Sequence, residues 1–112
     1  MVGFLFDLDQ TLIDSSTALT LRKSRSWPQV YALIRGFKCY DGVAELLALL
    51  TEREVPHGIV TSSPAPYCLK VIEHHQLRIT KPVCYHDTAD HKPHSAPIAK
   101  GIERLGLPPD RV

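Results

Sequence analysis

The stretch VGFLFDLDQTLIDS, residues 2–15, is apolar for five positions and then places Asp7 and Asp9 with a single residue between them. Residues that are apolar on both faces predict a buried parallel strand over residues 2–6. Side chains at i and i+2 leave a strand on the same face, and two carboxylates about 4 Å apart repel by about 4 kcal/mol at an effective dielectric near 20. A Mg²⁺ ion, which prefers oxygen ligands, would relieve that repulsion. The alternatives are that both carboxylates are solvated in a loop, or that Asp9 caps a following helix.

The composition predicts one globular domain. The chain has 112 residues, of which 44% are apolar and 22% charged, and this is ordinary for a folded domain. The formal net charge of +1 argues against a protein that coats polyanions, so nucleic acid is possible but not favoured as a partner. No apolar run is long enough to span a bilayer, and the N-terminus lacks the order of a signal peptide. The three cysteines have no paired spacing, which suits a reducing compartment, so we expect a soluble, cytoplasmic protein.

Strand-like and helix-like segments alternate along the chain. This alternation is typical of βαβ units with a parallel sheet and right-handed crossovers. Asp41 is expected to cap the helix that follows it, and Gly106 to end the last helix. We expect strands over residues 2–6, 55–63 and 81–87, one or two short helices within 14–35, longer helices over 42–53, 65–77 and 96–106, and a polar loop over 88–95.

Polar residues follow the second and third predicted strands, where ligands bind in parallel sheets. Thr61 and Ser62 end the second strand, and a hydroxyl with nearby backbone N–H groups would grip phosphate oxygens. The alternative is an ordinary helix cap before Pro64. Lys92 lies in the loop beyond the third strand and would neutralise a phosphate, or is simply solvated.

Taken in order, DLDQT (residues 7–11), IVTSS (59–63) and HKP (91–93) resemble the haloacid dehalogenase (HAD) superfamily. The resemblance covers nearly the whole chain. It implies an α/β, three-layer Rossmann-like fold, a parallel sheet flanked by helices, with a minimal or absent cap. Residues 1–112 would then form the N-terminal, incomplete portion of the core domain, with a short helical insert at about 14–40.

The resemblance also implies a Mg²⁺-dependent phosphatase that acts on a phosphorylated substrate through an aspartyl-phosphate. By analogy Asp7 is the nucleophile, and Asp9 is the general acid and then the base. The metal would be held by the Asp7 carboxylate and the Asp9 backbone carbonyl. Thr61, Ser62 and Lys92 would bind the phosphoryl group. The substrate itself is not indicated by these motifs.

The family's fourth motif, an acidic pair after a further strand, has no counterpart in these 112 residues. We therefore expect the last strand or strands to be missing, with weak Mg²⁺ binding and little turnover. An exposed sheet edge would favour self-association of the fragment. The alternative function is a catalytically incomplete domain that acts as a binding or regulatory module. Phosphomutase or dehalogenase chemistry is a third option.

Two further features of the sequence need interpretation. Gln10 stands where the family often has glycine, and we expect it to be accommodated without a positive φ. The stretch LRKSRSW, residues 21–27, gathers three cations beside Trp27. It is either a solvated helix face with the indole turned into the core, or the entry surface of an anionic substrate with the indole free to stack on a base.

A group of histidines near Cys84, His86 to His94, matches no paired zinc spacing, so we do not expect zinc.

Overall fold

The computed structural model describes residues 1–79 and 81–112. Two central strands, β1 (Phe4–Phe6) and β4 (His57–Ile59), pair in parallel. Beyond the end of β4, Val60 forms a parallel bridge with Val83. Two short strands, β2 (Ile13–Asp14) and β3 (Lys38–Cys39), pair antiparallel apart from this sheet. The helices are α1 (Leu19–Lys23), α2 (Trp27–Leu33), α3 (Val43–Glu52), α4 (Ala65–His74) and α5 (Ala96–Leu105), with 3₁₀ turns at Ser16–Ala18, Ile34–Gly36, Tyr85–Asp87 and Pro109–Arg111.

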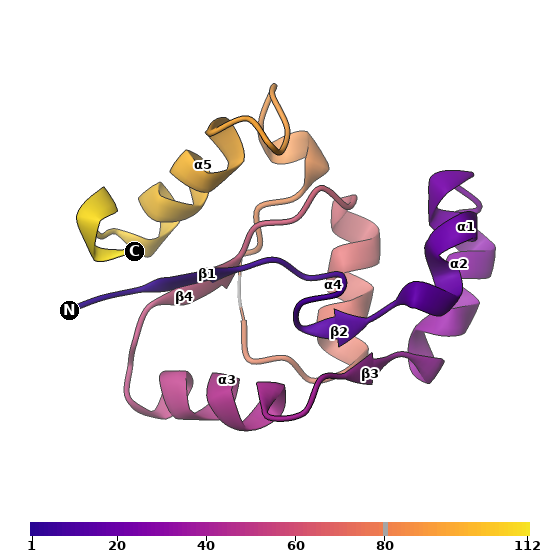
Figure 1. The fold of residues 1–112 in the computed structure, drawn as a ribbon, viewed down its shortest axis with the longest axis horizontal. Coiled ribbons are helices and arrows are strands. Elements are labelled where there is room, and N and C mark those ends of the chain that lie inside the picture. Colours follow the sequence, from indigo (N-terminus) through magenta and orange to yellow (C-terminus); the bar gives the residue numbers. More distant parts are fainter. Residues whose placement is uncertain (80) are drawn as a thin grey trace.

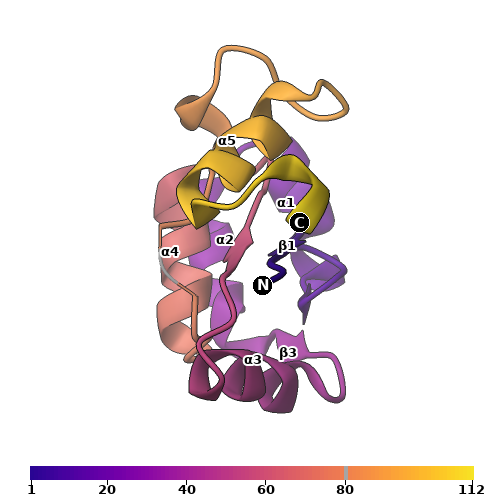
Figure 2. The same ribbon diagram turned by 90° about the vertical axis from the view of Figure 1, so that its left-hand side faces the viewer.

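The helices flank the two central strands. Helix α5 lies on one side of β1 and β4 and α3 lies on the other (Figure 1). Both termini lie at one end of the molecule, facing the viewer in Figure 2, and α1 and α2 lie at the opposite end. This arrangement confirms the predicted α/β class with a parallel sheet and flanking helices. Helices α1 and α2 lie within the predicted insert at about 14–40, whose boundaries stay a prediction.

The core forms where the apolar helix faces meet the strands. Helix α3 buries Val43, Leu47 and Leu50, which recur at i, i+4 and i+7 and so share one helix face. Helix α4 buries Tyr67, Cys68 and Val71 in the same way. All of these helix side chains except Leu50 form one apolar cluster with Leu8, Leu12 and Ile59. None of the helices in the described residues is long and apolar enough to cross a membrane.

The three longer helices confirm the sequence predictions, with Gly106 ending α5 at a φ of 70°. The predicted Asp41 cap is wrong: Gly42, at a φ of 86°, precedes α3 and no side chain caps it. The expectation that Gln10 does without a positive φ is also wrong, because its φ is 62°. Its side-chain carbonyl accepts the Ser15 backbone N–H at 2.8 Å, and this bond helps to offset the strain of a positive φ.

The third predicted strand, residues 81–87, is mostly absent as a strand. Within it, Val83 alone bridges the sheet among the described residues, and Tyr85–Asp87 forms a 3₁₀ turn. The turn forms because the Asp87 carboxylate accepts the Cys84 backbone N–H at 2.7 Å and draws the chain back on itself. The second strand, predicted over 55–63, is limited to His57–Ile59 and the bridge at Val60.

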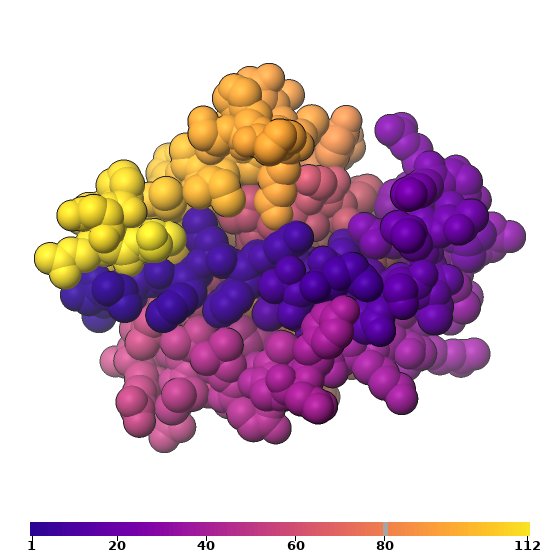
Figure 3. Space-filling view, in the orientation of Figure 1, coloured from indigo at the N-terminus to yellow at the C-terminus, as the bar shows by residue number. Residues whose placement is uncertain are grey.

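The first predicted strand, residues 2–6, is shorter than expected, at Phe4–Phe6, and it is not buried on both faces, because β1 is open to solvent on one of them. Figure 3 shows the N-terminal segment, in indigo, running across this face without another segment over it. Phe4 is 43% exposed, and within residues 1–79 and 81–112 β1 pairs with β4 alone. Unpaired strand edges favour association with other strands. Self-association stays a prediction.

Close packing of α5 on the sheet predicts the effect of a substitution at Gly101. A Cβ atom there would lie 2.7 Å from Val60 Cγ2 and 2.9 Å from Leu5 Cδ1. We expect Gly101→Val to lower the free energy of unfolding by about 2 kcal/mol, because added atoms in a packed core force neighbours apart. Urea unfolding measures this. The control is Gly36→Val, where a Cβ meets no atom within 4 Å; equal losses from both variants would contradict the packing argument.

Candidate active site

Asp7 and Lys92 meet at the carboxyl ends of the two central strands. Asp7 follows β1 directly, and its Oδ1 lies 3.1 Å from Lys92 Nζ. The same ammonium group donates a hydrogen bond of 2.7 Å to the carbonyl of Val60, at the end of β4. Lys92 therefore joins both strand ends, although it lies 32 residues along the chain from Val60. The Asp7 side chain is 47% exposed, so its carboxylate faces solvent and is open to a ligand.

The Asp9 carboxylate is surrounded by donors. Its Oδ1 accepts hydrogen bonds from Tyr67 Oη at 2.6 Å and Ser15 Oγ at 2.7 Å. Its Oδ2 accepts from Ser63 Oγ at 2.9 Å and pairs with Arg22 Nη2 at 3.0 Å. The side chain is only 11% exposed. Each aspartate thus has its own cation, Lys92 or Arg22, and these two cations offset the repulsion between the carboxylates.

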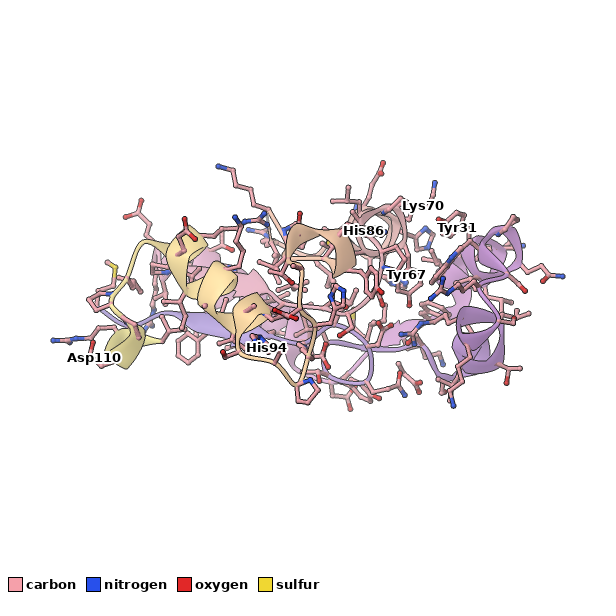
Figure 4. The ribbon with its side chains drawn as sticks, turned by 90° about the horizontal axis from the view of Figure 1, so that it is seen from above. Tyr31, Tyr67, Lys70, His86, His94 and Asp110 are labelled. Atoms are coloured by element: carbon pink, nitrogen blue, oxygen red, sulfur yellow. The ribbon has the colours of Figure 1, made fainter. Side chains whose placement is uncertain are left out.

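The residues of the basic stretch 21–27 differ in their surroundings, and no single one of the two interpretations describes all of them. Arg22 is neither solvated nor free, because it is bound to Asp9 and lies over the Tyr67 ring, with Cζ 5.3 Å from the ring centroid. Trp27 is half-buried, with its ring 5.7 Å from that of Tyr67, in agreement with the core reading. Lys23 and Arg25 are exposed. Figure 4 shows Tyr67 near Tyr31 and Lys70, beside α2.

Two of the three predicted phosphate-binding residues, Thr61 and Ser62, lie in a tight turn after β4. Thr61 is buried, with 4% exposure, and its backbone N–H is already used by the carbonyl of Val83. Its Oγ1 accepts the backbone N–H of Ser63 at 3.1 Å, which leaves the hydroxyl proton available to a phosphate oxygen. Ser62, by contrast, is exposed. The turn therefore presents side-chain hydroxyl groups, while the Thr61 backbone N–H is not available.

Sequence reasoning missed several side chains that hold Asp9. Ser15, Arg22 and Tyr67 come from a turn, a helix in the insert and a core helix, and no spacing links them to Asp9. Ser15 was within the quoted opening stretch, and a hydroxyl close to the acidic pair is the one local signal. In the sequence Tyr67 has the position of an ordinary core residue of an amphipathic helix. That position does not indicate its hydrogen bond to Asp9.

The donor set fits a magnesium ion held largely by water and substrate oxygens. Mg²⁺ is usually bound through one or two carboxylates, with phosphate oxygens and water as its other ligands. The exposed Asp7 carboxylate suits this role, whereas the Asp9 carboxylate is saturated, so Asp9 would contribute its backbone carbonyl. In the part of the chain that the structure describes, no three His, Cys, Asp or Glu side chains gather as a metal site.

Burial raises the pKa of the Tyr67 phenol, and the hydrogen bond to Asp9 and the negative charge of Asp9 raise that pKa further. A raised folded pKa stabilises the protein below the unfolded value near 10, and this stability is lost as pH rises above it. We expect Tyr67→Phe to flatten the loss of unfolding free energy above pH 10 by up to about 1.4 kcal/mol per pH unit. Urea unfolding at pH 8 and pH 10.5 measures the slope; identical slopes would contradict the role of Tyr67.

Residues 22–112 match the family model of haloacid dehalogenase-like hydrolases. No curated protein matches the sequence. The fold is similar to a HAD-superfamily hydrolase of subfamily IA from Geobacter sulfurreducens, with a TM-score of 0.80, 18% identity, and coverage of 97% of this chain and 76% of that one.

Two further solved structures are similar to the same extent. A proposed phosphoglycolate phosphatase from Lactobacillus plantarum gives a TM-score of 0.80 at 16% identity, covering 99% of this chain and 75% of that one. A proposed β-phosphoglucomutase from Thermotoga maritima gives 0.82 at 18% identity, covering 100% and 74%. At such identities the likeness shows the fold, and it agrees with the fold expected from the three motifs.

Proposed function

Because the chain belongs to the haloacid dehalogenase-like hydrolase family, we propose that it hydrolyses a phosphate monoester through an aspartyl-phosphate at Asp7, with Mg²⁺ as cofactor. The observation that supports this most directly is the exposed Asp7 carboxylate paired with Lys92 at the joint end of β1 and β4. An accessible carboxylate beside a fixed cation is the arrangement that attack on a phosphoryl group requires. A phosphorylated small molecule is the proposed substrate, and a cytoplasmic location is part of the proposal.

In the first step an Asp7 carboxylate oxygen attacks phosphorus, and the bond between phosphorus and the leaving oxygen breaks. Lys92 balances negative charge on the phosphoryl oxygens, and the hydroxyls of Thr61 and Ser62 donate to them. Mg²⁺, when bound beside Asp7, would reduce the repulsion between the attacking carboxylate and the phosphoryl oxygens. Lys92 is anchored by the Val60 carbonyl at 2.7 Å, so its position does not depend on substrate.

Asp9 is the proposed proton carrier. It gives a proton to the leaving oxygen in the first step and takes one from the attacking water in the second. That water then attacks phosphorus, the bond between phosphorus and the Asp7 carboxylate oxygen breaks, and inorganic phosphate leaves. In this structure both oxygens of Asp9 are engaged by four side chains. Asp9 must therefore exchange at least one of these bonds for the substrate before it can act.

One observation favours the alternative, a binding or regulatory module without turnover. The described residues supply a single open carboxylate for a metal, since Asp9 is saturated. A protein that binds phosphate esters weakly with Mg²⁺ but never cleaves them would have this site. The two functions differ in one measurable property, the release of phosphate.

The test is release of nitrophenolate from p-nitrophenyl phosphate by the purified protein, followed while Mg²⁺ is varied. We expect turnover to stop when the metal is removed with EDTA and to return on adding Mg²⁺, with no tight saturation, because only one side-chain carboxylate is offered. Acid quenching followed by mass spectrometry should detect phosphate bound to Asp7. Phosphate-ester binding with no cleavage at any Mg²⁺ concentration would favour the module.

A further inference from the structure

A cleft of about 510 Å³ opens between α1, the start of α2 and the turn that follows β4. Its volume is within the range of small-molecule sites, roughly 300–1,000 Å³. Figure 4 shows His86 and Tyr67 on the side of the molecule towards α1 and α2, and Asp110 at the far end. Charged, hydroxyl and aromatic side chains line it, those of Arg22, Lys23, Arg25, Trp27, Ser62, Ser63 and Tyr85.

The cleft adjoins Asp9. Two of its lining residues, Arg22 and Ser63, also bind Asp9 Oδ2, at 3.0 Å and 2.9 Å. Ser62, proposed to bind the phosphoryl group, lines it as well. Asp7 and Lys92 do not line the cleft. Asp9 is therefore in contact with the wall of the cleft through Arg22 and Ser63. Because Asp9 is the proposed proton donor to the leaving oxygen, the leaving group would lie on the side of Asp9 that adjoins the cleft.

The charge of the cleft is one-sided. Arg22 is paired with Asp9, but Lys23 and Arg25 are exposed and form no ion pair with any residue that the structure describes. No aspartate or glutamate lines the cleft among residues 1–79 and 81–112. The formal net charge of the whole chain is only +1, so two free cations here are a local excess. The rings of Trp27 and Tyr85 supply apolar wall between them.

We propose that this cleft receives the leaving group of the substrate, and that this leaving group carries a second anionic group, a carboxylate or a second phosphate. Lys23 and Arg25 bind that group, and the aromatic wall contacts the carbon skeleton. The inference rests on the proposed phosphatase function only for where the phosphoryl group of the substrate binds, which is beside Asp7. A polynucleotide is a poorer fit, because Lys23 and Arg25 lie together in one compact cleft, whereas a polynucleotide is bound by cations spread along its backbone.

Binding can be measured without turnover. Trp27 lines the cleft and is the single tryptophan of the chain, so its fluorescence reports on this site. In the Asp7→Asn variant we expect 3-phosphoglycerate and glycerol 1,3-bisphosphate to bind about 10-fold more tightly than glycerol 3-phosphate, which lacks the second anion. The affinity of 3-phosphoglycerate relative to that of glycerol 1,3-bisphosphate shows whether the cleft prefers a carboxylate or a phosphate as the second anionic group. Equal affinity for all three would overturn the inference.

The same preference should appear in kcat/KM of the wild-type protein. We expect the double variant Lys23→Gln with Arg25→Gln to lose the preference for 3-phosphoglycerate over glycerol 3-phosphate, a fall of about 10-fold in the ratio. The matched control is Arg35→Gln with Lys38→Gln, which removes two exposed cations of the same segment outside this cleft. An equal fall in the control would overturn the inference.

The failure of this inference can be told from failure of the proposed function. Hydrolysis of 3-phosphoglycerate and glycerol 3-phosphate at equal kcat/KM leaves the phosphatase intact and removes the second anion site. A protein that hydrolyses no ester removes the phosphatase. The fluorescence titration then decides the binding site by itself, because it needs no turnover.

Discussion

Replacing Asp7 by asparagine is expected to lower hydrolysis of p-nitrophenyl phosphate at least about 1,000-fold, because the amide cannot attack phosphorus. The fold should persist, since the side chain is 47% exposed and an amide oxygen can still accept the Leu8 backbone N–H, now bonded at 2.8 Å. Initial rates at saturating Mg²⁺ measure the effect, with thermal unfolding as the check on folding.

The matched control is Asp110→Asn, the same change at an exposed site in the last 3₁₀ turn, at the far end of the molecule in Figure 4. It should keep the wild-type rate. If Asp7→Asn retained more than about a tenth of that rate, Asp7 would not be the nucleophile, since loss of a nucleophile costs far more.

Replacing Asp9 by asparagine is expected to lower hydrolysis of an alkyl ester such as glycerol 3-phosphate about 100- to 10,000-fold, the usual contribution of a general acid or base. An aryl ester behaves differently, because nitrophenolate leaves without a proton. With p-nitrophenyl phosphate the variant should release about one equivalent of nitrophenolate quickly and then continue slowly, since hydrolysis of the aspartyl-phosphate still lacks its base.

Stopped-flow absorbance measures the burst and the slow phase. The control is Asp14→Asn, a nearby carboxylate that accepts hydrogen bonds from Ser16 and shares no hydrogen bond with Asp9 among the described residues. It should show neither the burst nor the loss of rate. Equal losses for alkyl and aryl esters with no burst in Asp9→Asn would mean that Asp9 only holds the structure, through Arg22, Ser15, Ser63 and Tyr67.

The Asp9 network also bears on how the insert is connected to catalysis. Arg22, in α1, pairs with Asp9, as does Ser15 at the start of this segment, and the Arg22 Nε is buried without a hydrogen-bond partner among the described residues. An N–H without an acceptor costs about 1–3 kcal/mol. The guanidinium is therefore not optimally bonded in this state, which favours its rearrangement when Asp9 engages a substrate.

Much of the fold was predictable because its signals are local. Helices α3, α4 and α5 each present apolar residues at helical spacing, and a glycine ends α5. The strand β1 is a short apolar run that ends at a carboxylate. The third predicted strand failed for a local reason too: the bond from the Cys84 N–H to Asp87 closes a turn, and apolar pattern carries no information about such a bond.

The sequence by itself determined the alternation of strands and helices, and with it that Asp7, Thr61 and Lys92 come after strand positions. These follow from apolar periodicity and turn residues, which act over a few positions. The tertiary structure alone decided the state of Asp9. Its partners lie 6, 13, 54 and 58 residues away along the chain. Such contacts depend on how distant elements pack together, so one carboxylate is enclosed and the other is left open to substrate.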